Sequence, residues 1–208
     1  MAQFFSVHPD NPQPRLVRQT CEILREGGLV AMPTDSSYAI VCHLGEKQAQ
    51  DRIRQLRGVD ERHHFTLLCR DLSEIGTYAQ VDNQQFRLLK ATTPGHYTFI
   101  LEATREVPRR LHHPKRNTIG LRVPAHPVTL AVLAELNEPL LGMTLILPGE
   151  TIPQHDAGEI RDRLERQIEL VIDAGACGIE PTTVIDLSGG EITVLRKGLG
   201  SLIPFGLE

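Results

Sequence analysis

The chain contains no tryptophan, and aromatic residues make up only 4% of it. It also lacks any apolar run of about 18 residues, so we predict no membrane-spanning helix. The opening segment, MAQFFSVHPDNPQP, has neither the charged start nor the apolar core of a secretory signal peptide. Together these absences predict a cytoplasmic protein with no membrane partner.

Cysteine is scarce and dispersed. Cys21, Cys42, Cys69 and Cys177 form no C-x-x-C pair, which favours reduced thiols over a zinc site or a redox motif, and we predict no metal site. The sequence has no G-x-G-x-x-G or Walker-A motif, which argues against Rossmann cofactors and P-loop chemistry. The formal net charge is −4, so any basic surface must be local.

Apolar runs and amphipathic segments alternate along the 208 residues, which predicts an α/β fold with a twisted mixed sheet and flanking helices. Strands are expected at 4–7, 29–32, 65–69, 97–101, 118–123, 140–147, 170–173, 182–186 and 192–196. Helices are expected at 15–26, 46–57, 84–91, 127–136 and 158–167, with a short one after Asp71. Ser188-Gly189-Gly190 predicts a hairpin between the last two strands. We expect an arm at 1–13, one domain at 14–200 and a tail at 201–208.

The stretch LVAMPTDSSYAIVC, residues 29–42, combines a buried strand with a polar turn. Pro33 ends regular pairing because it lacks an N–H, and four small oxygen-bearing side chains follow it. In α/β proteins such turns often hold ligand groups, but Pro, Asp and Ser are also ordinary turn formers. Local chemistry alone leaves both interpretations open.

Five segments in order resemble the motifs of the YrdC-like family, whose characterised members are threonylcarbamoyl-AMP synthases. The similarity spans residues 14–200 and is greatest to the YciO branch. The segments are Pro33-Thr34-Asp35-Ser36-Ser37-Tyr38, Pro94-Gly95-His96-Tyr97-Thr98, Thr118 to Pro127 (TIGLRVPAHP), Asp173-Ala174-Gly175 with Pro181-Thr182-Thr183-Val184-Ile185-Asp186, and Arg196-Lys197-Gly198.

The resemblance implies a fold with a positively charged concave cavity. It also implies the reaction of the synthases. L-threonine, bicarbonate and ATP with Mg²⁺ would give threonylcarbamoyl-AMP and pyrophosphate, for use in tRNA modification. No catalytic residue is assigned. The resemblance implies that Thr34, Ser36, Arg122 and Thr182 bind the amino-acid substrate, and that Arg57, Thr118, Thr144 and Arg196 bind the nucleotide.

Each of these assignments has a structural alternative. Arg122 lies in an apolar strand, where a charge is costly unless it is paired, so it serves either a ligand or an internal ion pair. Arg196 is otherwise a solvated strand end, and Thr182 a β-branched strand former.

The sequence departs from the synthases at two motifs. Their K-x-R pair aligns with Arg57-Gly58-Val59, and their S-x-N element with Thr144-Leu145-Ile146. Val59 supplies no cation and Ile146 no amide, so we expect the synthase activity to be weak or altered.

Basic residues cluster between positions 105 and 116, where only Glu106 opposes them. This segment is either a solvated surface or a contact for structured RNA or tRNA, made by Arg109, Arg110, Lys115 and Arg116. A non-catalytic protein that binds double-stranded RNA is therefore the alternative function. The sequence does not indicate an oligomeric state.

Overall fold

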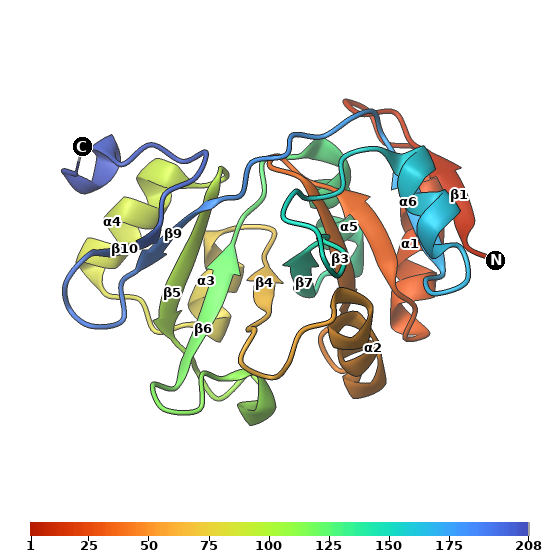
Figure 1. The fold of residues 1–208 in the computed structure, drawn as a ribbon. Helices are drawn as coiled ribbons and strands as arrows, with labels where there is room; N and C mark the ends of the chain where they lie inside the picture. Colours follow the sequence, from red (N-terminus) through yellow and green to blue (C-terminus); the bar gives the residue numbers. More distant parts are fainter. Residues whose placement is uncertain (208) are drawn as a thin grey trace.

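One mixed sheet runs through the whole protein (Figure 1). The computed structural model describes residues 1–207. The strand order within them is β1-β8-β2-β3-β7-β4-β6-β5-β9-β10. The strands are β1 Gln3–Ser6, β2 Val30–Pro33, β3 Tyr38–His43, β4 Thr66–Leu68, β5 Tyr97–Glu102, β6 Thr118–Arg122, β7 Leu140–Thr144, β8 Leu170–Asp173, β9 Thr183–Asp186 and β10 Thr193–Arg196.

The pairing is both parallel and antiparallel, which confirms the predicted α/β class and the mixed sheet. Strands β1 and β2 pair with β8 in parallel, as do β4 with β6 and β5 with β9. The other neighbours are antiparallel, including the predicted hairpin of β9 and β10.

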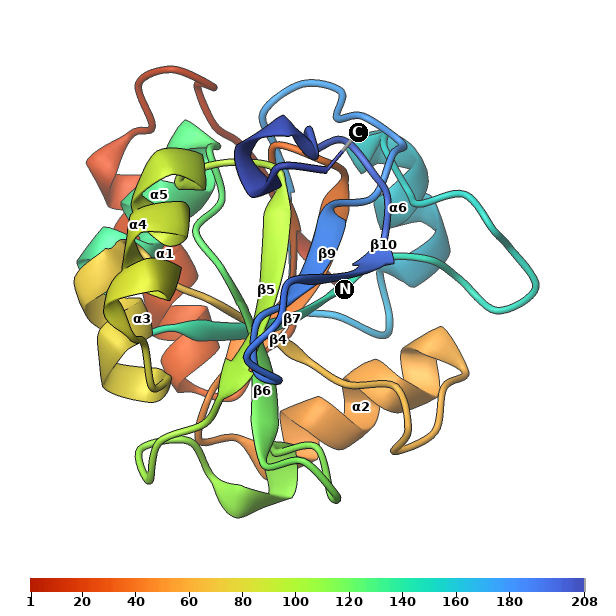
Figure 2. The same ribbon diagram turned by 90° about the vertical axis from the view of Figure 1, so that its left-hand side faces the viewer.

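Helices pack around this sheet at the predicted places. They are α1 Pro14–Arg25, α2 Lys47–Arg57, α3 Leu72–Tyr78, α4 Asn83–Thr92, α5 Pro127–Leu136 and α6 Ala157–Leu164, with 3-10 turns η1 Arg109–Leu111 and η2 Ile203–Phe205. In Figure 2, α1, α3, α4 and α5 gather on one side of the molecule, and α2 and α6 lie on the other. Among residues 1–207, no helix is long and apolar enough to cross a membrane.

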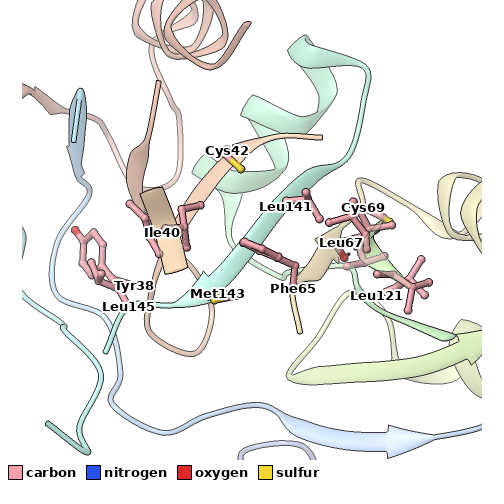
Figure 3. Close-up of a cluster of buried hydrophobic side chains, with 14 of the residues drawn as sticks. Tyr38, Ile40, Cys42, Phe65, Leu67, Cys69, Leu121, Leu141, Met143 and Leu145 are labelled. Atoms are coloured by element: carbon pink, nitrogen blue, oxygen red, sulfur yellow. Dashed lines mark hydrogen bonds between the residues drawn. The ribbon is translucent and has the colours of Figure 1, made fainter. Parts of the chain in front are cut away.

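The core fixes the middle of the sheet. Four strands at its centre contribute fully buried side chains to one apolar cluster, which includes Ile40, Leu67, Leu121 and Leu141 (Figure 3). Tyr38 is also fully buried, and its hydroxyl donates to the backbone oxygen of Ile172 at 2.9 Å. This packing holds β3, β4, β6 and β7 rigidly, so residues on their other face have fixed positions.

Several features differ from the sequence-based expectation, beginning with β3, which is not among the expected strands. Strand β7 ends at Thr144 rather than at 147, because the N–H of Ile146 turns back to the Thr144 oxygen at 3.0 Å. The strand expected at 4–7 within the arm forms as β1, one residue earlier, and pairs with β8. The expected tail forms η2, whose Phe205 is buried with its ring 5.5 Å from that of Tyr97; Glu208 lies outside the described residues.

Candidate functional site

A central cavity of about 210 Å³ opens where the middle strands of the sheet meet. Successive side chains of a strand point to opposite faces, so alternate residues share one face. The floor of the cavity is made by such alternate residues: Thr66 and Leu68, Thr98 and Ile100, Gly120 and Arg122, and Gly142 and Thr144. Its walls come from three other segments, which are the turn around Thr34, the pair His63-His64, and Thr182, Val184 and Arg196.

The turn after β2 is ordered chiefly by the Thr34 hydroxyl. Thr34 Oγ1 donates to the Ser37 oxygen at 2.6 Å and accepts the N–H groups of Ser36 and Ser37 at 3.2 and 3.3 Å. Thr129 Oγ1 on α5 donates to the oxygen of Pro33 at 2.6 Å. The Thr34 hydroxyl therefore shapes the turn, and the turn presents Ser36 to the cavity.

Arg122 is paired inside the protein, with Asp35 of the same turn. Nη2 of Arg122 donates to one Asp35 oxygen, and Nη1 donates to Ser36 Oγ at 3.2 Å. The side chains of Arg122 and Asp35 are only 9% and 5% exposed. Burial lowers the pKa of Arg122, and the Asp35 carboxylate opposes that shift. The structural alternative for Arg122 is thus realised, although the guanidinium also lines the cavity.

The other Asp35 oxygen faces His96. The distance to His96 Nδ1 is 2.8 Å, which is close enough for an ion pair when the imidazole is protonated, but the atoms are poorly aligned for a hydrogen bond. Within residues 1–207, Arg122 Nε is buried without a hydrogen-bond partner. The Asp35 carboxylate therefore lies between the Arg122 guanidinium and the His96 imidazole, and one donor of Arg122 stays unused.

Arg196 reaches the cavity from β10 and is held by Thr182. Its Nε donates to the Thr182 backbone oxygen at 3.0 Å, and its Nη2 donates to Thr182 Oγ1 at 3.2 Å. The Thr182 and Thr98 hydroxyls lie 2.9 Å apart. Gly198 lets the chain after β10 pack this closely, since a Cβ there would lie 2.2 Å from the Pro181 oxygen.

The histidine pair forms the outer wall of the cavity. Arg57 Nη1 donates to His63 Nε2 at 3.1 Å, so this nitrogen is the acceptor of a neutral imidazole. Partial burial and then the neighbouring Arg57 lower the pKa of His63, which favours the same neutral state at pH 7. Arg57 also donates from Nε to the Ile146 oxygen at 3.0 Å.

The cavity brings together six of the eight residues expected to bind ligands. These are Thr34, Ser36, Thr144, Thr182, Arg122 and Arg196. Arg57 does not line the cavity because its guanidinium lies behind His63. Thr118 does not line it either, since it lies at the other end of β6, opposite Glu102 of β5.

Sequence reasoning missed Asp35, His96 and Thr98 as parts of this site. All three belong to segments that the motif comparison had singled out, so the available signal was their place in those motifs. Their contacts depend on the fold. Within residues 1–207, no group of three His, Cys, Asp or Glu side chains is arranged to hold a metal ion.

Arg109, Arg110, Lys115 and Arg116, the residues assigned to RNA, are all exposed, and two of them also contact other side chains. Arg116 Nη1 pairs with Asp186 at 2.9 Å. Arg110 donates to Gln50 Oε1 at 3.2 Å, and at longer range to the oxygens of Leu44 and Gly45.

The motif-bearing segments that build this cavity coincide with a known family pattern. The Sua5/YciO/YrdC family model, described as "Telomere recombination", matches residues 22–198. The chain belongs to the Sua5/YciO/YrdC family. The "uncharacterized protein YciO" of Escherichia coli is 53% identical over 205 residues, covering 99% of this chain and 100% of that protein.

Solved and curated members of the family show how the chain relates to the rest of it. The crystal structure of E. coli YciO superposes with a TM-score of 0.95 over 99% of this chain and all of its own. A threonylcarbamoyl-AMP synthase of Halorhodospira halophila is 28% identical over 184 residues, covering 88% of this chain and 95% of the synthase. Sua5 of P. abyssi, solved with L-threonine, has a TM-score of 0.86 at 24% identity over 95% of this chain and 58% of Sua5. The Sua5/YciO/YrdC family thus joins this chain to threonylcarbamoyl-AMP synthases and, at the level of the fold, to Sua5.

Proposed function

We propose that the central cavity binds a small amino acid such as L-threonine together with ATP. The carrying observation is that two polar sets from distant segments, Ser36 with Arg122 and Thr182 with Arg196, line one cavity. Arg122 suits a carboxylate, and Arg196 suits a phosphate, because a guanidinium can form paired hydrogen bonds to either anion. The related synthases and the Sua5 complex with L-threonine support the same choice of ligands.

The proposed reaction is that of the related synthases, at a reduced rate. L-threonine, bicarbonate and ATP would give threonylcarbamoyl-AMP, pyrophosphate and water, and Mg²⁺ would enter with ATP as part of the substrate. Charge that develops on the phosphoryl oxygens must be met by fixed cations. Val59 provides no cation here and packs against the core, while Arg57 is held by His63 and the Ile146 oxygen.

The size of the cavity favours amino-acid binding over full enclosure of a nucleotide. Ligand pockets commonly measure roughly 300–1,000 Å³, whereas this one measures about 210 Å³. Threonine fits within such a space, and ATP must extend beyond it, past Arg196 at the wall. This supports the proposal that amino-acid binding, on the Thr34 side of the cavity, is retained better than ATP binding.

Calorimetry with ATP and L-threonine, added separately and together, tests the proposal. We expect L-threonine and ATP each to bind, and pyrophosphate release with bicarbonate and Mg²⁺ to be slow. The variant Val59→Arg/Ile146→Asn should raise that rate, because it returns a cation and an amide to the two altered motifs. No heat with either ligand, together with no pyrophosphate release, would refute the proposal. L-valine is the matched control ligand, since it lacks the hydroxyl.

RNA binding is the second candidate function, favoured by the exposure of Arg109 and Lys115 on one segment. Because phosphates would dominate such contacts, affinity for a structured RNA should fall steeply with salt. Binding that is absent, or insensitive to salt, counts against this candidate.

A further inference from the structure

A second pocket lies on the other side of the wall that closes the central cavity. It measures about 320 Å³, and His64 and Phe65 line both spaces. Its sides come from α2 and from the segment around η1. In Figure 1, α2 lies along the lower edge of the molecule. The hydrogen bond from Arg110 Nε to Gln50 Oε1, at 3.2 Å, ties the two sides together.

Cations outnumber carboxylates around this pocket, although the whole chain has a net charge of −4. Lys47 and Arg54 line one side, and Arg109 and Arg110 line the other. The acids among the lining residues are Asp51 and Glu61, and His64 and His112 also line the pocket. Such a concentration of positive charge in a hollow attracts anions more strongly than the same charges on a convex surface, because low-dielectric walls focus the field.

Arg54 has a hydrogen-bond donor that the protein leaves without an acceptor. Its guanidinium lies over the Phe65 ring, 4.9 Å from the centroid, and its Nη1 is 3.6 Å from Asp51. Its Nε is buried and has no hydrogen-bond partner within residues 1–207. A buried donor without a partner is costly, and a ligand oxygen would offset that cost.

We propose that this second pocket is a phosphate-binding site distinct from the central cavity. Arg54 and Arg110 are pre-positioned by Phe65 and Gln50, and the exposed cations Lys47 and Arg109 complete the set that contacts the anion. The ligand is a phosphate group, carried either by a free polyphosphate or by the backbone of an RNA strand. Because the His64–Phe65 wall is shared, an anion here also contacts the segment that bounds the central cavity.

The experiment measures binding of inorganic diphosphate by calorimetry in the Arg196→Ala protein, which lacks the arginine that the proposed function assigns to phosphate in the central cavity. We expect one diphosphate to bind. Adding Arg109→Ala should weaken that binding about tenfold, as expected for loss of one charge-assisted hydrogen bond. Arg105→Ala is the matched control: it removes an exposed cation from the same segment but outside the pocket, so the affinity should not change.

A second variant tests the proposal by a gain in diphosphate affinity, which misfolding of the variant would not produce. Glu61→Gln removes one acid from the pocket, so it should strengthen diphosphate binding by about two- to threefold. The proposal is overturned if Arg196→Ala abolishes all diphosphate binding, or if Arg109→Ala and Glu61→Gln leave the affinity unchanged. Competition by a short RNA duplex would identify RNA as the source of the phosphate, and absence of competition would identify a free polyphosphate. These measurements use no threonine and no turnover, so they stand or fall apart from the proposed synthase activity.

Discussion

Asp35→Asn is expected to lower the free energy of unfolding by about 3 kcal/mol, the low end of what breaking a buried ion pair costs. The reason is the burial of Arg122, whose guanidinium would lose its carboxylate while remaining out of water. Asparagine keeps the shape and one acceptor oxygen of the side chain, so packing is preserved and the charge is the main change. Urea denaturation of the purified variant measures the effect.

The matched control is Asp162→Asn, which neutralises an exposed carboxylate on α6 and should change stability by no more than about 0.5 kcal/mol. The double variant Asp35→Asn/Arg122→Met separates the pair from the position. It removes the uncompensated cation and keeps a side chain of similar length, so it should regain most of the lost stability. If Asp35→Asn unfolds at the same urea concentration as the unchanged protein, the ion pair contributes nothing.

That pair also illustrates what the sequence could not predict. The apolar strand around Arg122 showed that its charge needed a partner, but Asp35 lies 87 residues away. Asp35 lies in the turn before β3 and Arg122 ends β6, and the sheet order β3-β7-β4-β6 sets how far apart these two strands lie. Such an order, in which sequence neighbours are separated and distant strands are adjacent, depends on packing throughout the domain and has no local signature.

Local features were predictable for the opposite reason. Gly58 ends α2 in a left-handed conformation, with φ of 62°, and Asp71 caps α3 by accepting the N–H of Glu74. The hairpin of β9 and β10 forms at the glycine pair that signalled it. Each of these structures is decided by residues a few positions apart, so the sequence contains all the information needed.

Thr118 combines a local feature that the sequence predicts with a long-range one that it does not. Strand alternation correctly places it on the same face as Arg122. A strand rises about 3.3 Å per residue, however, so the two Cα atoms are about 13 Å apart. The central cavity covers only the Arg122 end of β6, and the extent of a cavity along a strand is set by the loops and side chains above it. Periodicity therefore gives the face but not the position along it.

Arg196→Ala is expected to weaken ATP binding by about 10- to 100-fold, which corresponds to one or two lost charge-assisted hydrogen bonds. This prediction follows from the contacts of Thr182, which fix the Arg196 guanidinium at the cavity wall through Nε and Nη2. A cation that is already ordered loses little entropy on binding phosphate, so its removal is more costly than that of a freely moving lysine. Calorimetry with ATP and Mg²⁺ gives the dissociation constant directly.

Two further variants show whether Arg196 acts on the ligand itself. Lys197→Ala removes the neighbouring exposed cation, which does not line the cavity, and should leave ATP binding unchanged. Thr182→Val keeps the volume but removes the hydroxyl that receives Nη2, so the guanidinium is less well positioned and ATP binding should fall by less than in Arg196→Ala. Equal effects of Arg196→Ala and Lys197→Ala would mean that ATP responds to the overall charge of this end of the protein. A graded loss, largest for Arg196→Ala, smaller for Thr182→Val and absent for Lys197→Ala, is the result that direct contact between Arg196 and the nucleotide requires.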